Sequence, residues 1–443
     1  MLAAIGIGSV DELFVHVPAH LRARGPIALP PGITETALRE RLAVLGRRNT
    51  GARAVVFAGG GAYPHVVPAL VDQVLQRSEF TTAYTPYQAE VSQGTLQAIF
   101  EFQTFVAMLL GLEVANASMY DGASAAAEAV LMARRLAPDR RVVWIARALH
   151  PHYRAVVATY VRGLGDIELR EIPYSKDGRT DLATLAQALG PQALCVVLGY
   201  PNVFGVVEDI SRAARLAHAA GALLVTVTTE ALALVQLRAP GQAGADVAVA
   251  EGQSLGLPLS YGGPGVGLLA SHERYVRSMP GRIVGETVDG KGRRGFVLTL
   301  ATREQHIRRE RATSNICTNQ GLCALAVTTY LAALGRRGLQ AVAESNLRAA
   351  HRAARLLREA GVPQVFDGPF FNEFVVRIPQ AAARWTELAT EAQLVAGVPL
   401  GRWYPEHPDA LLLCVTEAHS AADVERLVEA LGRARQAVRA VEA

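Results

Sequence analysis

Lysine is almost absent from this chain of 443 residues. Only Lys176 and Lys291 are present, although lysine and arginine together number 44. An arginine guanidinium stays protonated and is not a Schiff-base nucleophile. Chemistry that needs a side-chain amine therefore has only two candidate residues.

Cysteine is also scarce, and its spacing does not match that of a metal site. Cys195 and Cys414 lie in apolar, strand-like runs, where a buried free thiol is the ordinary state. Cys317 and Cys323 could form a redox pair, but two further free thiols are the expectation in a chain so poor in cysteine.

The chain also lacks a large charge imbalance and a long apolar run. Its net charge is +4, and no basic run alternates with aromatic residues, which disfavours nucleic acid as a partner. The longest apolar stretch, 221–237, is shorter than a membrane span and contains Glu230. The N-terminus has no basic signal-peptide region. We expect a soluble, cytoplasmic protein.

Apolar strand patterns alternate with helical patterns through the middle of the sequence. Strands are expected at 115–119, 141–146, 194–198 and 222–227, with helices at 93–112, from 123, at 181–188 and at 211–220. This alternation predicts an α/β fold with a mostly parallel sheet covered on both faces. We expect an N-terminal arm (1–65), a large domain (66–325) and a smaller C-terminal α+β domain (326–443). The small domain has predicted strands at 374–378 and 411–415 and a helix at 421–437.

The segment 244–267 reads GADVAVAEGQSLGLPLSYGGPGVG. A short apolar strand, a polar tip and a Gly/Pro-rich turn present the cofactor lysine in pyridoxal-phosphate (PLP) enzymes of the aminotransferase-like fold. Here the tip residue is Gln253, whose amide nitrogen is not nucleophilic and forms no Schiff base. The usual covalent attachment of PLP is excluded at this position.

The acid that such a site needs is missing too. A carboxylate beside the pyridine nitrogen keeps that nitrogen protonated, so that the ring can accept carbanion electrons. The expected position, at the end of the preceding strand, falls nearest Val227, and Glu230 lies out of register. Two absences together indicate a site that has lost its cofactor.

Two further segments carry features of a cofactor site. Gly122, Ala123 and Ser124 follow a strand and open a helix, which would suit a phosphate cradle or a simple strand–helix turn. His150 follows the next strand, where it could stack on a pyridine ring or be an ordinary hydrogen-bonded histidine.

Two other segments are rich in polar side chains. The loop 82–90 contains Tyr84, Thr85, Pro86, Tyr87 and Gln88, which could line a polar pocket or anchor a proline-containing loop. The segment 302–311 has mixed charges at helical spacing, which predicts a solvated, salt-bridged helix face, with a subunit interface as the alternative.

Taken together, these strings resemble a known family over essentially the whole chain. They are YTPYQAEVSQG, ANASMYDGASAAAEA, DVAVAEGQSLGLPLSYGGPG, MPGRIVGETVDGKGRRGFVLTLATREQHIRRERATSNICTNQ and PFFNEF. The set is similar to the alpha subunits of two-subunit bacterial glycine dehydrogenase (decarboxylating), the P-protein of the glycine cleavage system.

The resemblance implies a PLP-dependent transferase-like fold (fold type I) without bound PLP. Gln253 falls on the lysine position and Val227 on the acid position. The beta subunit would hold PLP, and two chains of each kind would form an α2β2 heterotetramer. Together they would decarboxylate glycine and transfer its aminomethyl group to the lipoyl group of H-protein. This chain alone is expected to be inactive.

The resemblance also implies that this chain completes the partner's active site. We expect the completing residues to be Tyr84–Gln88 together with Tyr261, Gly262 and Gly263. Two alternatives remain open at this point. One is an enzyme that binds PLP noncovalently through 121–125 and acts alone with His150. The other is a structural or regulatory subunit with no role in a pocket.

Overall fold

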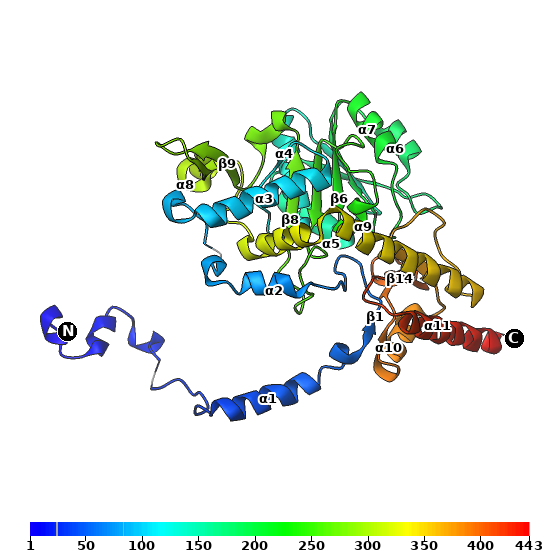
Figure 1. Cartoon of the computed structure of the whole chain (residues 1–443), viewed down its shortest axis with the longest axis horizontal. Helices are drawn as coiled ribbons and strands as arrows, with labels where there is room; N and C mark the ends of the chain where they lie inside the picture. The colour runs from blue at the N-terminus through cyan, green and yellow to red at the C-terminus, as the bar shows by residue number, and fades with distance from the viewer. Residues whose placement is uncertain (24, 83, 443) are drawn as a thin grey trace. The chain divides into compact units, whose positions relative to one another are not determined.

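The computed structural model describes residues 1–23, 25–82 and 84–442, and it divides into two compact units. Unit 1, Met1–Ala52, contains three short 3₁₀ turns and helix α1 (Glu35–Arg47). The Thr34 side chain caps α1 by accepting a hydrogen bond from the backbone N–H of Ala37. Unit 2, Arg53–Ala443, contains the described sheets and the remaining α-helices, which Figure 1 labels together with some of the strands.

A seven-stranded sheet organises the first part of unit 2, and its strand order is β2-β8-β7-β6-β5-β3-β4. The strands are β2 (Val114–Ala115), β3 (Val142–Ala146), β4 (Glu168–Ile172), β5 (Ala193–Gly199), β6 (Leu223–Thr228), β7 (Val247–Glu251) and β8 (Gly267–Ser271). Strands β3 to β7 pair in parallel, whereas β8 pairs antiparallel with β7 and β2. The predicted α/β fold with a mostly parallel sheet is confirmed.

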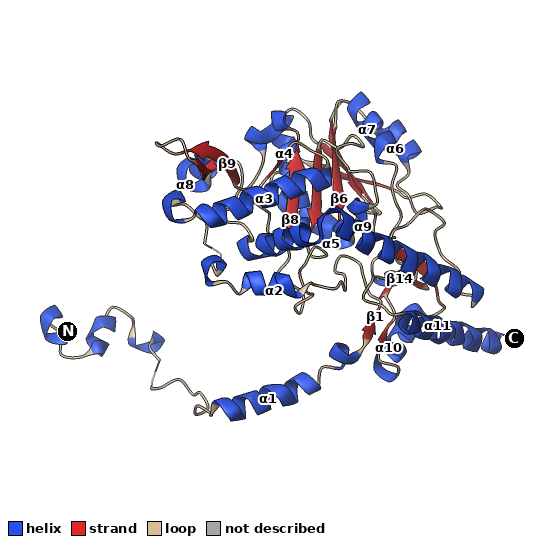
Figure 2. Ribbon diagram, viewed as in Figure 1, coloured by secondary structure: helices blue, strands red, loops and turns tan. Residues whose placement is uncertain are grey.

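Helices alternate with these strands, and Figure 2 shows α3 and α9 crossing in front of the sheet in this view. The helices of this region are α2 (Ala69–Leu75), α3 (Gln93–Leu110), α4 (Gly122–Leu136), α5 (Pro151–Arg162), α6 (Leu182–Ala188) and α7 (Ile210–Ala219). Every residue of β3, β5, β7 and β8 is buried, as expected for strands covered on both faces. Helix α5 and strands β4 and β8 were not predicted from the sequence.

The C-terminal part begins with the long helix α9 (Gly321–Glu359), which is interrupted at Gly335 by non-helical backbone angles. An antiparallel sheet of β11 (Glu373–Arg377), β14 (Ala410–Cys414) and β13 (Val398–Pro399) follows, with helices α10 (Ala381–Glu391) and α11 (Ala421–Glu442). The two predicted strands and the closing helix are confirmed. Strand β12 (Leu394–Val395) pairs in parallel with β1 (Val55–Val56), which comes from the segment predicted to be the arm. The predicted boundary between large and small domains stays a prediction.

A hairpin of β9 (Ile283–Val288) and β10 (Arg294–Thr299) precedes the mixed-charge segment. The prediction of one regular helix at 302–311 was wrong. The segment forms three short turns, a 3₁₀ turn at 301–303, α8 (Gln305–Arg308) and a 3₁₀ turn at 309–311. Positive φ angles at Leu300 and Arg309 break the helix, and Arg303 turns inward to donate to the backbone carbonyls of Val276 and Gly281.

Three properties of the described ranges bear on function. No helix within them has the length and apolar character needed to cross a bilayer. No group of three or more His, Cys, Asp or Glu side chains among the described residues is arranged to hold a metal ion. All four cysteines are free, and Cys195 and Cys414 are buried as predicted.

Candidate functional site

Gln253 lies just beyond the end of β7, as the lysine-like position requires, but its side chain is fully engaged. Its Oε1 accepts a hydrogen bond from the backbone N–H of Tyr63 at 2.9 Å. Its Nε2 donates to the backbone carbonyls of Tyr63 at 3.1 Å and Leu257 at 2.8 Å. The amide therefore pairs with both backbone polar groups of Tyr63 and ties a distant part of the chain to this site.

That distant part is the segment Gly59–His65, which we call the plug. The Tyr63 ring is fully buried, and its Oη lies 3.0 Å from both Glu373 Oε2 and Thr229 Oγ1. Glu373 Oε1 accepts a hydrogen bond from the backbone N–H of Gly60 at 2.6 Å. Burial raises the pKa of Glu373 to about 8, although the Gly60 and Tyr63 donors oppose that shift. The plug is thus held by polar contacts along much of its length.

His150 lies under the plug. Its Nε2 donates to the Gly60 carbonyl at 2.7 Å, and its Nδ1 accepts from the backbone N–H of His152 at 3.2 Å. A Cβ added to Gly61 would lie 3.5 Å from His150 Nε2, so the backbone covers the imidazole. Burial lowers the pKa of His150 to about 4, and the ring is neutral at pH 7. His150 is a buried, hydrogen-bonded side chain, which was one of the two interpretations of the sequence.

The predicted cradle at the start of α4 is occupied by carboxylates of the same chain. The backbone N–H of Gly122 donates to Glu251 Oε2 at 2.8 Å, and that of Ser124 donates to Asp121 Oδ1 at 2.6 Å. A Cβ added to Gly122 would lie 2.5 Å from the Tyr153 hydroxyl and 3.1 Å from Glu251 Cβ. Glycine at 122 allows this close approach, but the group that approaches is part of the protein.

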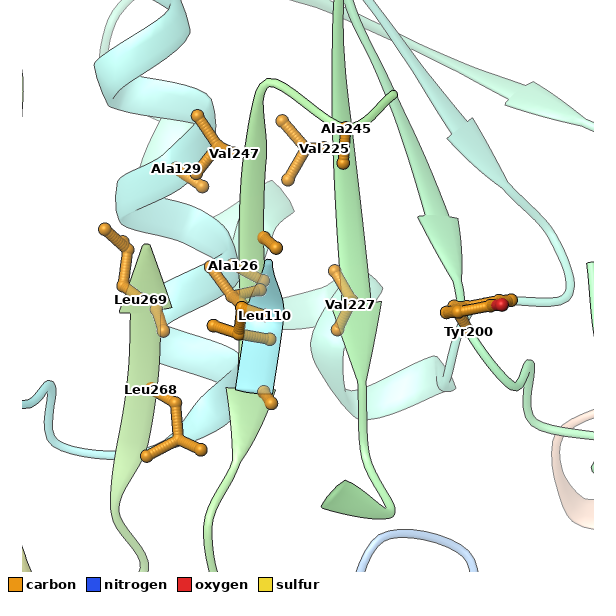
Figure 3. Packing of buried hydrophobic residues seen from close by; sticks show 14 of the residues in the cluster. Leu110, Ala126, Ala129, Tyr200, Val225, Val227, Ala245, Val247, Leu268 and Leu269 are labelled. Carbon is orange, nitrogen blue, oxygen red and sulfur yellow. The ribbon is translucent and has the colours of Figure 1, made fainter. Parts of the chain in front are cut away.

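Val227 belongs to the apolar core. Its side chain is fully buried in the main hydrophobic cluster, with Val225 from the same strand and with Leu110 and Ala126 (Figure 3). Nothing at this position can form an ion pair with a pyridine nitrogen. Of the six residues predicted for the vestigial cofactor site, Gly122 binds Glu251, and His150 and Gln253 both bind the plug. Ser124 instead pairs with Asp121 at the start of α4.

Glu230, the carboxylate judged out of register, is buried and bound elsewhere. Its Oε2 lies 2.9 Å from His65 Nε2 and 3.0 Å from Asn372 Nδ2. His65 Nδ1 lies 2.9 Å from Glu417 Oε2. Burial disfavours the imidazolium, but Glu230 and Glu417 outweigh it and raise the pKa of His65 to about 10. A protonated His65 therefore joins two carboxylates at the end of the plug.

The residues present do not fit PLP. A bound PLP would need an amine at 253, an acid near 227, a free face at the ring-stacking position and free amides at the α4 terminus. The chain instead has Gln253 tied to Tyr63, an apolar Val227, a covered His150 and a Gly122 amide already bound to Glu251.

The 82–90 loop, predicted to complete a partner's pocket, is buried at its centre, whereas its two tyrosine side chains are exposed. Thr85 and Pro86 are buried, and the Thr85 hydroxyl lies 2.9 Å from that of Thr318. Tyr84 is 76% exposed. Its ring and that of Tyr87 pack edge to face, with 5.8 Å between the ring centroids. Ala83, within this loop, lies outside the described residues. Gln88 is exposed and precedes a short 3₁₀ turn.

Arg282 holds Tyr87 in place, and the sequence analysis gave it no role. Its Nη2 donates to the Tyr87 hydroxyl at 2.7 Å, and its guanidinium lies 4.7 Å from the centre of the Tyr87 ring. The guanidinium also pairs with Glu304 and donates to the Cys317 carbonyl. Because Arg282 donates to the phenol oxygen, the phenol proton remains free for another acceptor.

Tyr261, Gly262 and Gly263 form an exposed turn. Tyr261 has a φ of 58° and a fully exposed side chain. The two glycines have positive φ angles of 107° and 152°, which explains the choice of glycine at both positions. An aromatic side chain held in a left-handed backbone without covering residues is an unusual feature for a surface turn.

Sequence reasoning missed Glu251, Tyr63 and Tyr153 as parts of this site. Glu251 did carry a signal, because a lone carboxylate ends an otherwise apolar strand, VAVAE. Tyr63 carried no such signal, since the plug has no periodicity and its partners lie 166 to 310 residues further along the chain.

Comparisons with known proteins place the chain in a narrow group. Residues 1–431 match the family described as Glycine cleavage system P-protein. A relative named Probable glycine dehydrogenase (decarboxylating) subunit 1 from Anaeromyxobacter dehalogenans (strain 2CP-C) is 55% identical, covering 95% of this chain and 94% of the relative. A protein of the same name from Sorangium cellulosum (strain So ce56) is 51% identical, covering 97% of this chain and 96% of its own length.

Solved structures agree with this assignment. A crystal structure of glycine decarboxylase (P-protein) of the glycine cleavage system, in inhibitor-bound form, is 44% identical with a TM-score of 0.91. It covers 98% of this chain and 97% of that chain. A sphingosine-1-phosphate lyase from Burkholderia pseudomallei K96243 has a TM-score of 0.66 at 17% identity over 96% of each chain, which shows the shared fold alone.

Proposed function

The chain belongs to the glycine cleavage system P-protein family, and from this we propose that it acts as the alpha subunit of a glycine dehydrogenase (decarboxylating). The name subunit 1 of its relatives implies a partner subunit. The observation that carries the proposal is that the would-be cofactor site is filled by Gln253, Tyr63 and Glu251, while aromatic side chains on two loops remain exposed. The cofactor lysine and PLP then belong to the beta subunit, and the assembly is α2β2.

Exposed apolar side chains support a partner surface on unit 2. Soluble proteins rarely leave several large apolar side chains uncovered in one region. Between 66 and 108 the exposed large hydrophobic residues are Val66, Leu70, Tyr84, Tyr87, Val91 and Met108. An open groove of about 570 Å³ beside the 82–90 loop is lined by side chains of α2, α3 and α9, among them Leu70, Val74 and Leu325.

In the complex, PLP on the partner would supply the electron sink for the carbanion left when glycine loses CO2. This chain's share is to bind, orient and exclude water. Tyr87, fixed by Arg282, can donate its phenol proton to a polar group of the bound substrate. The rings of Tyr84, Tyr87 and Tyr261 can wall off water, which would otherwise protonate the carbanion. The aminomethyl group then passes to the lipoyl group of H-protein.

Activity and assembly can be tested together. The chain and the beta subunit are purified separately, and glycine–bicarbonate exchange is measured for each alone and for the mixture. We expect exchange only in the mixture, with the two chains eluting together in gel filtration. Glycine-dependent exchange by this chain alone would contradict the proposal and favour an enzyme that acts without a partner.

The two tyrosines of the 82–90 loop, Tyr84 and Tyr87, have their own test. Tyr84→Phe and Tyr87→Phe remove one hydroxyl each and keep the apolar ring. Loss of a single hydrogen bond in a closed pocket should lower kcat/KM of the complex by roughly tenfold without weakening assembly. The control is Tyr160→Phe, which removes a tyrosine hydroxyl from α5, outside both loops. An unchanged kcat/KM in both Tyr84→Phe and Tyr87→Phe would favour a purely structural subunit.

A further inference from the structure

The ion pair between Arg282 and Glu304 joins three surface segments at one buried point. Only 4% of the Arg282 side chain and 12% of the Glu304 side chain are exposed. Arg282 Nη2 donates to the Tyr87 hydroxyl of the 82–90 loop, and its Nε donates to the Cys317 carbonyl at 3.1 Å. Its Nη1 pairs with Glu304, which belongs to the mixed-charge segment. The three segments therefore converge on one guanidinium.

Glu304 is also held from within its own segment. The neighbouring Arg303 donates to the Gly281 carbonyl at 3.1 Å, which fixes the chain at this point. His306 Nδ1 lies 3.4 Å from Glu304 Oε2, the same oxygen that pairs with Arg282. The carboxylate therefore lies between a buried guanidinium and an exposed imidazole, and contacts on both sides set its orientation.

Glu304 supplies the counter-charge that the other partners of Arg282 lack. The Tyr87 hydroxyl and the Cys317 carbonyl are neutral acceptors, and among the described residues Glu304 is the one carboxylate that forms an ion pair with Arg282. A guanidinium this deeply buried needs such a partner, because an unpaired buried charge is costly. Since the guanidinium is planar and its donors point in fixed directions, pairing with Glu304 also orients the donor that faces Tyr87.

We propose that Glu304 is a positioning residue for the reaction of the complex: by holding Arg282, it directs the phenol proton of Tyr87 towards the partner's pocket. This inference rests on the proposed role of Tyr87 and names the residue that sets the geometry of that side chain. Glu304 acts through Arg282 and has no contact with substrate. The mixed-charge segment thereby has a role other than the solvated helix face that its sequence predicted.

A double-mutant cycle in the complex with the beta subunit tests this role, with kcat and KM for glycine measured in glycine–bicarbonate exchange. Glu304→Gln keeps the size of the side chain and removes its charge. In the wild-type background it should lower kcat by about tenfold and change KM for glycine by less than about twofold. In the Tyr87→Phe background it should change kcat by less than about twofold, because the phenol on which it acts is already absent. An equal loss in both backgrounds would show that Glu304 only holds the surface segments together, and would overturn the proposal.

Glu310→Gln is the matched control. It removes the same charge from the same segment, at a side chain that is 78% exposed. Its kcat and KM should equal those of the wild type. A tenfold loss of kcat in this variant as well would mean that the segment responds to any change of charge, and the proposal would fail.

The outcomes separate this inference from the proposed function. If Tyr87→Phe alone leaves kcat/KM unchanged, the role of Tyr87 fails and this inference fails with it. If Tyr87→Phe is impaired but Glu304→Gln is not, this inference alone fails. Should Glu304→Gln not assemble in gel filtration, Glu304→Asp takes its place, because it keeps the charge on a shorter stem. Glu304→Asp should then lower kcat in the wild-type background only, and an equal loss in both backgrounds overturns the proposal.

Discussion

Gln253 shows how one side chain can close a site as well as disable it. A lysine lost to a small apolar residue would leave a hole, whereas the glutamine amide pairs with both backbone groups of Tyr63. The residue therefore excludes covalent cofactor attachment and also anchors the plug. Restoring a lysine here should not restore a cofactor site.

We expect Gln253→Lys to bind no PLP as a Schiff base and to lower the free energy of unfolding by about 1–3 kcal/mol. The cost arises because the Tyr63 N–H loses its acceptor in a buried environment. Visible absorbance after PLP addition and urea unfolding provide the two measurements, with Gln242→Lys at an exposed position as the control. A PLP-dependent absorbance band specific to Gln253→Lys would contradict this prediction.

His65 gives the stability of the chain a defined pH dependence. Its pKa is about 10 in the folded protein, against roughly 6.5 in an unfolded chain. The folded state therefore keeps a proton that the unfolded state releases, so this stabilisation is complete below about pH 6.5 and is lost as pH rises towards 10.

His65→Gln should remove that contribution, which has a slope of at most about 1.4 kcal/mol per pH unit. Urea unfolding of wild type and variant between pH 6 and 10 measures it, and His16→Gln at an exposed position serves as the control. An unchanged slope in His65→Gln would mean that His65 is not protonated between Glu230 and Glu417.

At the scale of elements, helices and strands with a regular apolar pattern could be predicted from the sequence, whereas segments without such a pattern could not. The buried strands β3 and β5 were predictable because each is a continuous apolar run, and β6 because it is rich in apolar and β-branched residues. Strand β4, ELREI, was missed because it is largely exposed and its charged residues hide the pattern. The plug was unpredictable for a different reason, since its position depends on contacts with residues hundreds of positions away.

The site itself was predictable only in part. The sequence showed which groups were missing, because lysine and the strand-end acid are defined by residue type and position. It could not show what fills the vacated space, because Glu251, Tyr153 and Tyr63 reach it through tertiary packing. The predicted role of Tyr84–Gln88 and Tyr261–Gly263 in a partner's pocket remains a prediction.

Helix α9 offers a test at the element scale. Gly335 has φ 56° and ψ −174° inside an otherwise helical segment, and a Cβ there would meet no atom within 4 Å. Gly335→Ala should therefore destabilise the chain by about 1–2 kcal/mol through backbone strain alone. Equal thermal midpoints for wild type and Gly335→Ala would show that the helix straightens without penalty.

At the scale of the whole molecule, the family fold is retained while its would-be cofactor site is filled. The amide at the α4 terminus is bound by Glu251, and the turn after β7 is held by the contacts between Gln253 and Tyr63. The aromatic residues at 84, 87 and 261 are exposed, and we propose that they contact the partner. We therefore propose that cofactor chemistry belongs to the beta subunit and that this chain has a shielding, orienting role.

Borohydride trapping tests this division of labour most directly. The reconstituted complex is incubated with PLP and reduced, which fixes any Schiff base as a stable pyridoxyl-lysine, and both subunits are digested and analysed by mass spectrometry. We predict the pyridoxyl group on one lysine of the beta subunit and on neither Lys176 nor Lys291 of this chain. Stoichiometric pyridoxyl label on either of these two lysines would contradict the account.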